Sequence, residues 1–166
     1  LQWVRADFYN PISQFLITIT NPLLKPLRRF IPGYGGVDWP AVVLMLLLKA
    51  LEISVLALLV TGRLPSLPGL LIVSLADILS LVIYIFIIAV FIQVVLSWVN
   101  PQAYNPATVL LYKLTDPLLR PARRLIPPIG GLDLSPIVVF IALQLILILL
   151  VKPLSHLGFS LGGFVI

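Results

Sequence analysis

Long apolar stretches separated by short polar segments run along the chain, and this pattern predicts membrane-spanning helices. The apolar stretches are Trp39–Thr61, Leu70–Trp98 and Ser135–Val151. About 20 apolar residues in a helix cross the roughly 30 Å hydrocarbon layer of a bilayer. Lys152 and Pro153 are expected to end the third helix. The pattern therefore predicts an all-α membrane protein.

The pattern repeats itself at an offset of 95 residues. Residues 20–38 read TNPLLKPLRRFIPGYGGVD and align without a gap with residues 115–133, which read TDPLLRPARRLIPPIGGLD. A gapless match of this kind indicates a tandem duplication. Each unit is expected to consist of a helix, a basic amphipathic loop and a second helix. Because each unit crosses the membrane twice, the two repeats are expected to be parallel.

The duplication also predicts the boundaries of the two repeats. We expect the first repeat over residues 1–61, a turn on the outer side over 62–69, the second repeat over 70–153 and an apolar interfacial tail over 154–166. The first residue aligns with Leu96, which lies near the end of an apolar stretch. We therefore expect four transmembrane helices in the full-length protein, the first of them missing or nearly missing here. A cleaved signal peptide is the alternative.

Composition narrows the class of protein and of chemistry. Of the 166 residues, 60% are hydrophobic and only 10% are charged, against about 25% charged residues in soluble domains. The chain has no cysteine and a single histidine, His156. Disulfides, thiolate metal sites and two-histidine metal sites are thereby excluded. We expect no cofactor, no bound metal, no nucleic-acid partner and no enzymatic activity.

The basic residues are unevenly distributed between the two sides of the predicted membrane. The two repeat loops carry eight Lys and Arg residues, whereas the opposite side carries only Arg63 and Lys152. Lysine and arginine are enriched in cytoplasmic loops. We therefore expect a multi-pass protein of the bacterial inner membrane whose basic loops face the cytoplasm.

Each basic loop is expected to form an amphipathic helix in the membrane interface. In the second copy Asp116 is suited to the N-cap and Pro117 to the first turn, and leucines and arginines fall on opposite faces. Asn10 and Asn105 are expected to cap the apolar segment before each loop, which lies in the interface or, alternatively, re-enters the membrane. Binding of anionic lipid headgroups or partner proteins is one interpretation, and a topology signal is the other. The candidate binding residues are Lys25, Arg28, Arg29, Arg120, Arg123 and Arg124.

The segment that leads from each basic loop into the next span has a proline, a glycine pair and an aspartate. The glycines permit positive φ angles. Asp38 and Asp133 are expected to cap the following spans, or to pair with an arginine of the basic loop. In that alternative Arg28 or Arg29 pairs with Asp38, and Arg123 or Arg124 with Asp133. The candidate loop-structure residues are Pro32, Gly35, Gly36, Asp38, Pro127, Gly130, Gly131 and Asp133.

Lys49 and Glu52 are charged residues near the middle of the first span. Their i,i+3 spacing places them on one helix face. An ionised group at this depth costs about 2.5–3.5 kcal/mol on insertion scales, so it normally faces protein or water. The pair is a proton or cation relay, a polar contact with a partner's span, or a self-neutralising ion pair between helices. Asp77 and Gln93 could line the same internal face.

The paired motif NPLLKPLRRFIPGYGGVD and DPLLRPARRLIPPIGGLDLSP resembles the YggT family of small bacterial and plastid membrane proteins. The resemblance covers both repeats and implies an inner-membrane protein with four helices. It also implies a link to osmotic or salt tolerance, while plastid members are implicated in cytochrome assembly. The first copy departs from the family pattern at Gly33 and at Trp39-Pro40.

Two functions follow from these features. The first is a non-enzymatic scaffold or assembly factor that docks partners or anionic lipid through the twin cytoplasmic basic loops. The alternative is a small oligomeric channel or transporter component for cations or osmolytes, which internal duplication favours. The expected partners are the lipid bilayer, other membrane proteins and a second copy of the chain.

Overall fold

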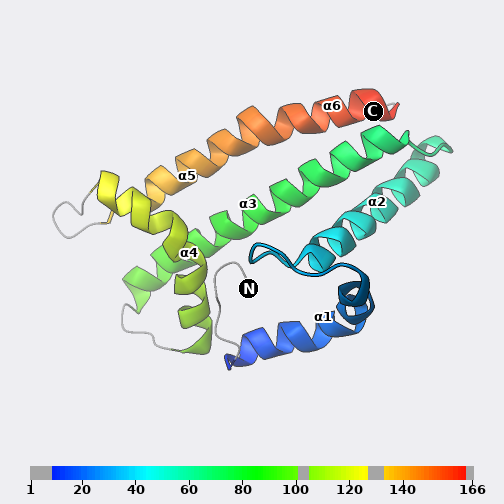
Figure 1. The fold of residues 1–166 in the computed structure, drawn as a ribbon. Coiled ribbons are helices and arrows are strands. Elements are labelled where there is room, and N and C mark those ends of the chain that lie inside the picture. Colours follow the sequence, from blue (N-terminus) through cyan, green and yellow to red (C-terminus); the bar gives the residue numbers. More distant parts are fainter. Residues whose placement is uncertain (1–8, 101–104, 127–132, 164–166) are drawn as a thin grey trace. The chain divides into compact units, whose positions relative to one another are not determined.

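The computed structural model describes residues 9–100, 105–126 and 133–163, and these residues are almost entirely helical (Figure 1). The elements are α1 (Pro11–Phe30), α2 (Trp39–Thr61), α3 (Leu67–Val99), α4 (Pro106–Leu125), α5 (Ser135–Ile146), the π-helical turn η1 (Leu147–Val151) and α6 (Lys152–Gly162).

Three of these helical segments are long and apolar enough to cross a membrane. They are α2, α3 and the continuous run from Ser135 to Gly162. At 1.5 Å per residue, the 33 residues of α3 extend about 50 Å, which exceeds the hydrocarbon thickness. Many of their leucine and isoleucine side chains are exposed, as expected for helices that face lipid. The prediction of an all-α membrane protein is thereby confirmed, while the fourth span and the repeat organisation stay predictions.

The third spanning helix is longer than the sequence pattern predicts. Lys152 and Pro153 do not end it, because the chain continues as α6 to Gly162. A proline normally clashes with the carbonyl four residues before it and removes one helical hydrogen bond. Here the backbone widens to a π-helical turn just before Pro153, and the Lys152 N–H bonds to the Leu147 carbonyl, five residues back. The prediction that the third helix ends at Lys152 and Pro153 is therefore wrong. The interfacial position of residues 154–166 stays a prediction.

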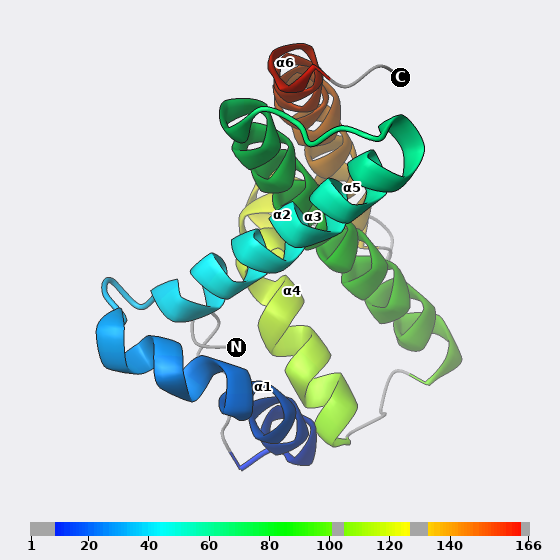
Figure 2. The ribbon, with the colours of Figure 1, turned by 90° about the vertical axis from the view of Figure 1, so that its right-hand side faces the viewer.

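Helices α1 and α4 each combine an apolar segment and a basic segment in one continuous helix. Asn10 and Asn105 cap their first turns, as predicted: the Asn10 side chain accepts a hydrogen bond from the Ile12 N–H, and Asn105 forms a capping box with Thr108. Asp116 is not an N-cap, because it lies in the middle of α4 and forms an ion pair with Arg120. Each of these helices contains two internal prolines and changes direction along its length (Figures 1 and 2). Prolines are a common cause of helix kinks.

The chain divides into two compact units. The first comprises residues 1–40 and 85–143, and the second comprises residues 41–84 and 144–166. In the first unit the N-terminal ends of α1 and α4 lie next to each other (Figure 2), and the Asn10 amide donates a hydrogen bond to the Pro106 carbonyl over 2.6 Å. The C-terminal half of α3 packs on α4 in the same unit, where Thr115 donates a hydrogen bond to Gln93.

In the second unit, glycines let the N-terminal turns of α3 approach α6 closely. Gly158 and Gly162 are spaced four residues apart, which is the small-xxx-small pattern of membrane helix contacts. A Cβ added to Gly69 would lie 2.2 Å from the Gly162 Cα, and one added to Gly158 would lie 2.6 Å from a methyl group of Val73. Ser66 strengthens this contact by donating hydrogen bonds to the Leu161 and Gly162 carbonyls.

We predict that Gly69→Ala destabilises the protein by about 1–3 kcal/mol, the usual cost of overpacking. The added methyl group would meet the backbone of α6, which cannot yield without moving the helix. Thermal unfolding of purified protein in detergent measures the effect. Gly33→Ala is the matched control, since a Cβ there would meet only the Val37 carbonyl at 3.4 Å. Equal stability of the two variants would contradict the close α3–α6 contact.

Candidate functional site

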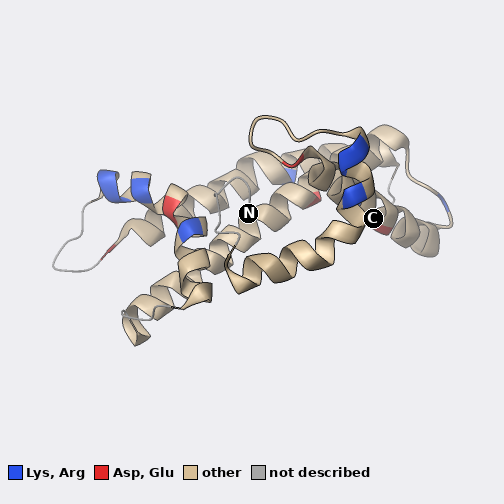
Figure 3. Cartoon of the chain, turned by 60° about the horizontal axis from the view of Figure 1, so that its bottom comes forward, with Lys and Arg blue, Asp and Glu red and all other residues tan. Residues whose placement is uncertain are grey.

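The candidate site consists of two basic helix ends, which we define as the last residues of α1 with Lys25, Arg28 and Arg29 and those of α4 with Arg120, Arg123 and Arg124. In Figure 3, ribbon segments coloured blue for Lys and Arg gather near the C-terminal end of each helix. All six residues are exposed. Cations in the last turn of a helix interact favourably with the helix dipole. The arginines in the last turns of α1 and α4 therefore stabilise both helix ends.

The basic end of α1 is tied to the start of α2 by one arginine. Arg28 forms an ion pair with Asp38 at 2.5 Å and also donates a hydrogen bond to Asn21. A tight turn brings Asp38 back to the helix: Gly35 and Gly36 have φ angles of 65° and 77°. Two consecutive positive φ angles are accessible to glycine without steric cost.

The basic end of α4 has the same kind of tie to the start of α5. Arg123 donates a hydrogen bond to Asp133 over 2.9 Å, and the Asp133 carboxylate also accepts one from the Ser135 N–H. Partial burial opposes ionisation of Asp133, but the hydrogen bonds from Ser135 and the charge of Arg123 outweigh it. Together they hold the pKa of the carboxyl below its ordinary value.

The ion pairs divide the six predicted binding residues into two groups. Arg28 and Arg123 are engaged by the aspartates described above, and Arg120 is paired with Asp116 at 2.6 Å. Within the described part of the chain, the remaining three basic side chains have no ion-pair partner. These unpaired residues are Lys25, Arg29 and Arg124.

The predicted loop-structure residues lie only partly within the structure. Pro32, Gly35 and Gly36 are exposed in the segment between α1 and α2. Pro127, Gly130 and Gly131 lie outside the described residues. The structure thus brings together an Arg–Asp pair at both helix ends and shows a glycine turn at the first.

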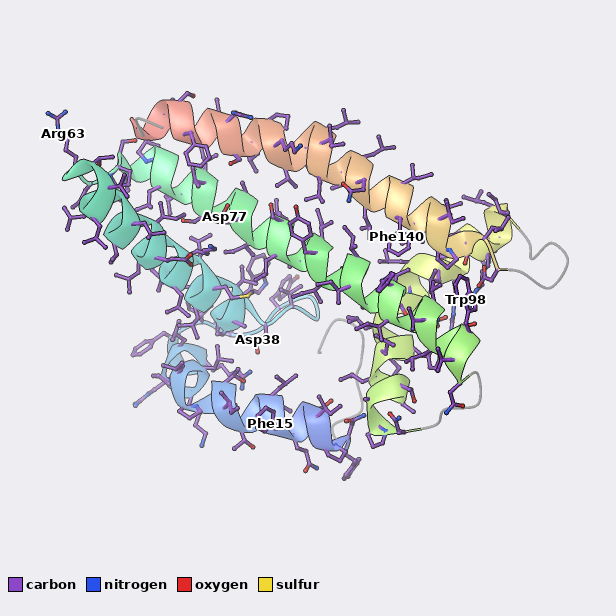
Figure 4. All side chains as sticks on the ribbon, turned by 180° about the vertical axis from the view of Figure 1, so that it is seen from behind. Phe15, Asp38, Arg63, Asp77, Trp98 and Phe140 are labelled. Atoms are coloured by element: carbon purple, nitrogen blue, oxygen red, sulfur yellow. The ribbon has the colours of Figure 1, made fainter. Side chains whose placement is uncertain are left out.

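The intramembrane charges form a cluster of three rather than a pair. Lys49 lies 3.1 Å from Glu52 on α2 and 3.2 Å from Asp77 on α3. Asp77 is labelled in Figure 4. The side chains of Lys49, Glu52 and Asp77 are 27%, 54% and 37% exposed. The cluster joins two spanning helices and, with all three groups ionised, carries one net negative charge. Gln93 lies elsewhere on α3, against Thr115 of α4.

Most of the chain matches the model of a known protein family. The family model described as CCB3/YggT matches residues 1–59 and 72–154. The match includes both basic helix ends, both aspartates that pair with them and the intramembrane Lys49 and Glu52.

The chain belongs to the CCB3/YggT family. An uncharacterized protein of Pseudomonas aeruginosa, PA0392, is 49% identical over 93% of this chain and 79% of its own length. The uncharacterized protein YggT of Escherichia coli K12 is 37% identical over 88% of this chain and 75% of its own length. The chloroplastic YlmG homolog protein 2 of Arabidopsis thaliana is 45% identical over 32% of this chain and 21% of its own length. No solved structure matches the chain significantly.

We predict that Asp133 stabilises the fold at neutral pH and loses this effect in acid. A carboxyl whose pKa is lowered on folding contributes fully above the ordinary Asp pKa of about 4. The contribution disappears as the pH falls from there through the lower pKa of the folded protein. The free energy of unfolding of wild type should therefore exceed that of Asp133→Asn by about 0.2–1 kcal/mol near pH 7. This difference should shrink below about pH 4.

Denaturant unfolding in detergent at a series of pH values measures this difference. Arg123→Gln is the companion variant, because it removes the guanidinium and leaves the carboxyl in place. This variant should reduce the change in the free energy of unfolding between neutral and acidic pH. A stability difference that stays constant down to strongly acidic pH would show that the pair does not contribute.

Proposed function

We propose that the protein is a non-enzymatic scaffold or assembly factor of the bacterial inner membrane. Its two basic helix ends bind anionic lipid headgroups on the cytoplasmic face and hold partner proteins there. The link between the family and osmotic or salt tolerance suggests where this activity is used. The proposal applies to the protein in its bilayer, in which the three spanning helices are anchored.

The division of the basic residues is the observation that carries this proposal. Arg28 and Arg123 are used internally, and each fixes a basic helix end against the start of a spanning helix. Lys25, Arg29 and Arg124 remain exposed without an ion-pair partner among the described residues. A rigidly held surface with unpaired cations beside a membrane is suited to bind anions, because the ordering of the side chains has already been achieved.

The three unpaired basic residues are expected to contribute substantially to the free energy of binding to an anionic membrane surface. Each Lys or Arg near an anionic membrane surface contributes about 1 kcal/mol, so three residues contribute roughly 3 kcal/mol, or about a hundredfold in binding. The interaction is screened by salt, since the Debye length is about 8 Å at physiological ionic strength. A topology signal alone would not require the Arg–Asp ties.

The alternative function is a small oligomeric channel or transporter component, and the intramembrane cluster favours it. Lys49 lies ten residues after Trp39 and twelve before Thr61, or about 15 and 18 Å from the ends of α2. Charged groups at this depth mark ion or proton pathways in many membrane proteins. Glu52 is 54% exposed, so a second copy, another protein or water would have to cover it.

We predict that Lys25→Gln, Arg29→Gln and Arg124→Gln together abolish a preference of the protein for anionic lipid. In reconstituted bilayers, electron paramagnetic resonance of spin-labelled phosphatidylglycerol and phosphatidylcholine measures the relative affinity of each lipid for the protein surface. Wild type should favour phosphatidylglycerol, and added salt should reduce this preference. The triple variant should show little preference at any salt concentration.

Arg63→Gln with Lys152→Gln is the matched control, because it removes two basic residues on the predicted opposite side. This variant should keep the preference for phosphatidylglycerol. Equal lipid preference in wild type and the triple variant would contradict the proposal. Flux of K⁺ or H⁺ in the same proteoliposomes under an osmotic step, lost in Asp77→Asn, would favour the transporter alternative instead.

A further inference from the structure

We propose that a pocket between α3, α4 and the start of α5 binds one anionic glycerophospholipid, with an acyl chain inside the pocket and the phosphate at its basic mouth. This inference rests on the proposed function and adds to it a specific lipid site on one of the two basic helix ends. The pocket lies entirely within the first compact unit.

The pocket has the size and lining of a ligand site. Its volume is about 570 Å³, within the range of about 300–1,000 Å³ typical of small-molecule sites. Its walls are largely apolar and include the aromatic side chains Trp98 and Phe140, which are labelled in Figure 4. Such a lining is suited to a hydrocarbon chain.

A buried amide lies in the wall of this pocket. Gln93 is 8% exposed and accepts a hydrogen bond from Thr115 through its Oε1 atom. Its Nε2 group has no hydrogen-bond partner among the described residues. This group is not fully enclosed by protein, so an acceptor atom of a ligand in the pocket can reach it and accept a hydrogen bond. The ester carbonyls of a glycerophospholipid are acceptors of this kind.

The lining residues of the pocket extend from the helix ends into the spanning helices α3 and α5. Arg123 and Asp133 lie at the mouth, just before α5 enters the membrane. Phe140 is five residues into α5, and Val90 is nine residues from the end of α3, which places them about 8 and 14 Å deeper. Gln93 lies between these levels, six residues from the end of α3.

Charge complementarity selects an anionic headgroup over a neutral one. Arg123 lines the mouth of the pocket, and Arg124 follows it in the last turn of α4 without an ion-pair partner in the described structure. Asp133 neutralises part of the charge of Arg123. Arg124, which does not itself line the pocket, adds a second cation in the same helical turn. Guanidinium groups bind phosphate oxygens by charge-assisted hydrogen bonds.

Native mass spectrometry of the detergent-solubilised full-length protein tests this site. The protein is mixed with equal amounts of phosphatidylglycerol and phosphatidylcholine, and the lipid retained per chain is measured. We expect one phosphatidylglycerol to be retained by wild type. Val94→Trp should abolish retention, because Val94 lines the pocket. Gln93→Leu should weaken it about tenfold through the lost hydrogen bond.

Ile92→Trp is the matched control. It introduces the same tryptophan side chain at nearly the same depth of α3, but at a position that is 43% exposed and does not line the pocket. Thermal unfolding of each variant verifies that it is folded. Retention of one phosphatidylglycerol by wild type and Ile92→Trp, and its loss in Val94→Trp, would support the site.

Other results would overturn the inference. They are no retained lipid in wild type, equal retention of phosphatidylcholine, or unchanged retention in Val94→Trp. Failure here is distinguishable from failure of the proposed function. Spin-label selectivity that depends on Lys25, Arg29 and Arg124, without a retained lipid, would leave the basic surface intact and remove only the pocket.

Discussion

Hydrocarbon cannot solvate an uncompensated charge, and this constraint governs how the charges of the chain are arranged. Three helical segments are apolar over membrane-spanning lengths. Where charge does enter a span, Lys49 lies beside two carboxylates from two helices. Six basic residues gather near the C-terminal ends of α1 and α4, namely Lys25, Arg28, Arg29, Arg120, Arg123 and Arg124. Helices in lipid associate mainly by close packing. The glycines between α3 and α6 permit such a close contact.

Each basic helix end is connected to the following span by an arginine–aspartate pair. Arg28 and Arg123 have the same role at positions 95 residues apart. Because the aspartate directly precedes the following helix, the pair ties the basic helix end to the start of that helix. The neighbouring Arg29 and Arg124 are exposed and have no ion-pair partner among the described residues. In the proposed function they bind anionic headgroups. The lipid pocket extends this arrangement inward from Arg123 along α3 and α5.

Much of this organisation could be predicted from the sequence, because hydropathy and charge are local properties. The bounds of α2 agree with the apolar stretch Trp39–Thr61, and Asn10 and Asn105 were identifiable as caps. The end of the third helix was not predictable, since a π-helical turn accommodates Pro153. Asp77 beside Lys49, and Gln93 beside Thr115, depend on how helices pack. The spacing of Gly158 and Gly162 was a usable signal for the α3–α6 contact.

The proposed function requires both basic helix ends to face the cytoplasm, on the side of the membrane opposite the α2–α3 turn. The chain has no cysteine, so single cysteines report topology directly. Phe30→Cys, Leu125→Cys and Leu64→Cys keep every charge, at positions that are 81%, 75% and 68% exposed. In intact spheroplasts, a membrane-impermeant maleimide should label only Leu64→Cys, and permeabilisation should expose the other two. Labelling of either Phe30→Cys or Leu125→Cys before permeabilisation would contradict the account.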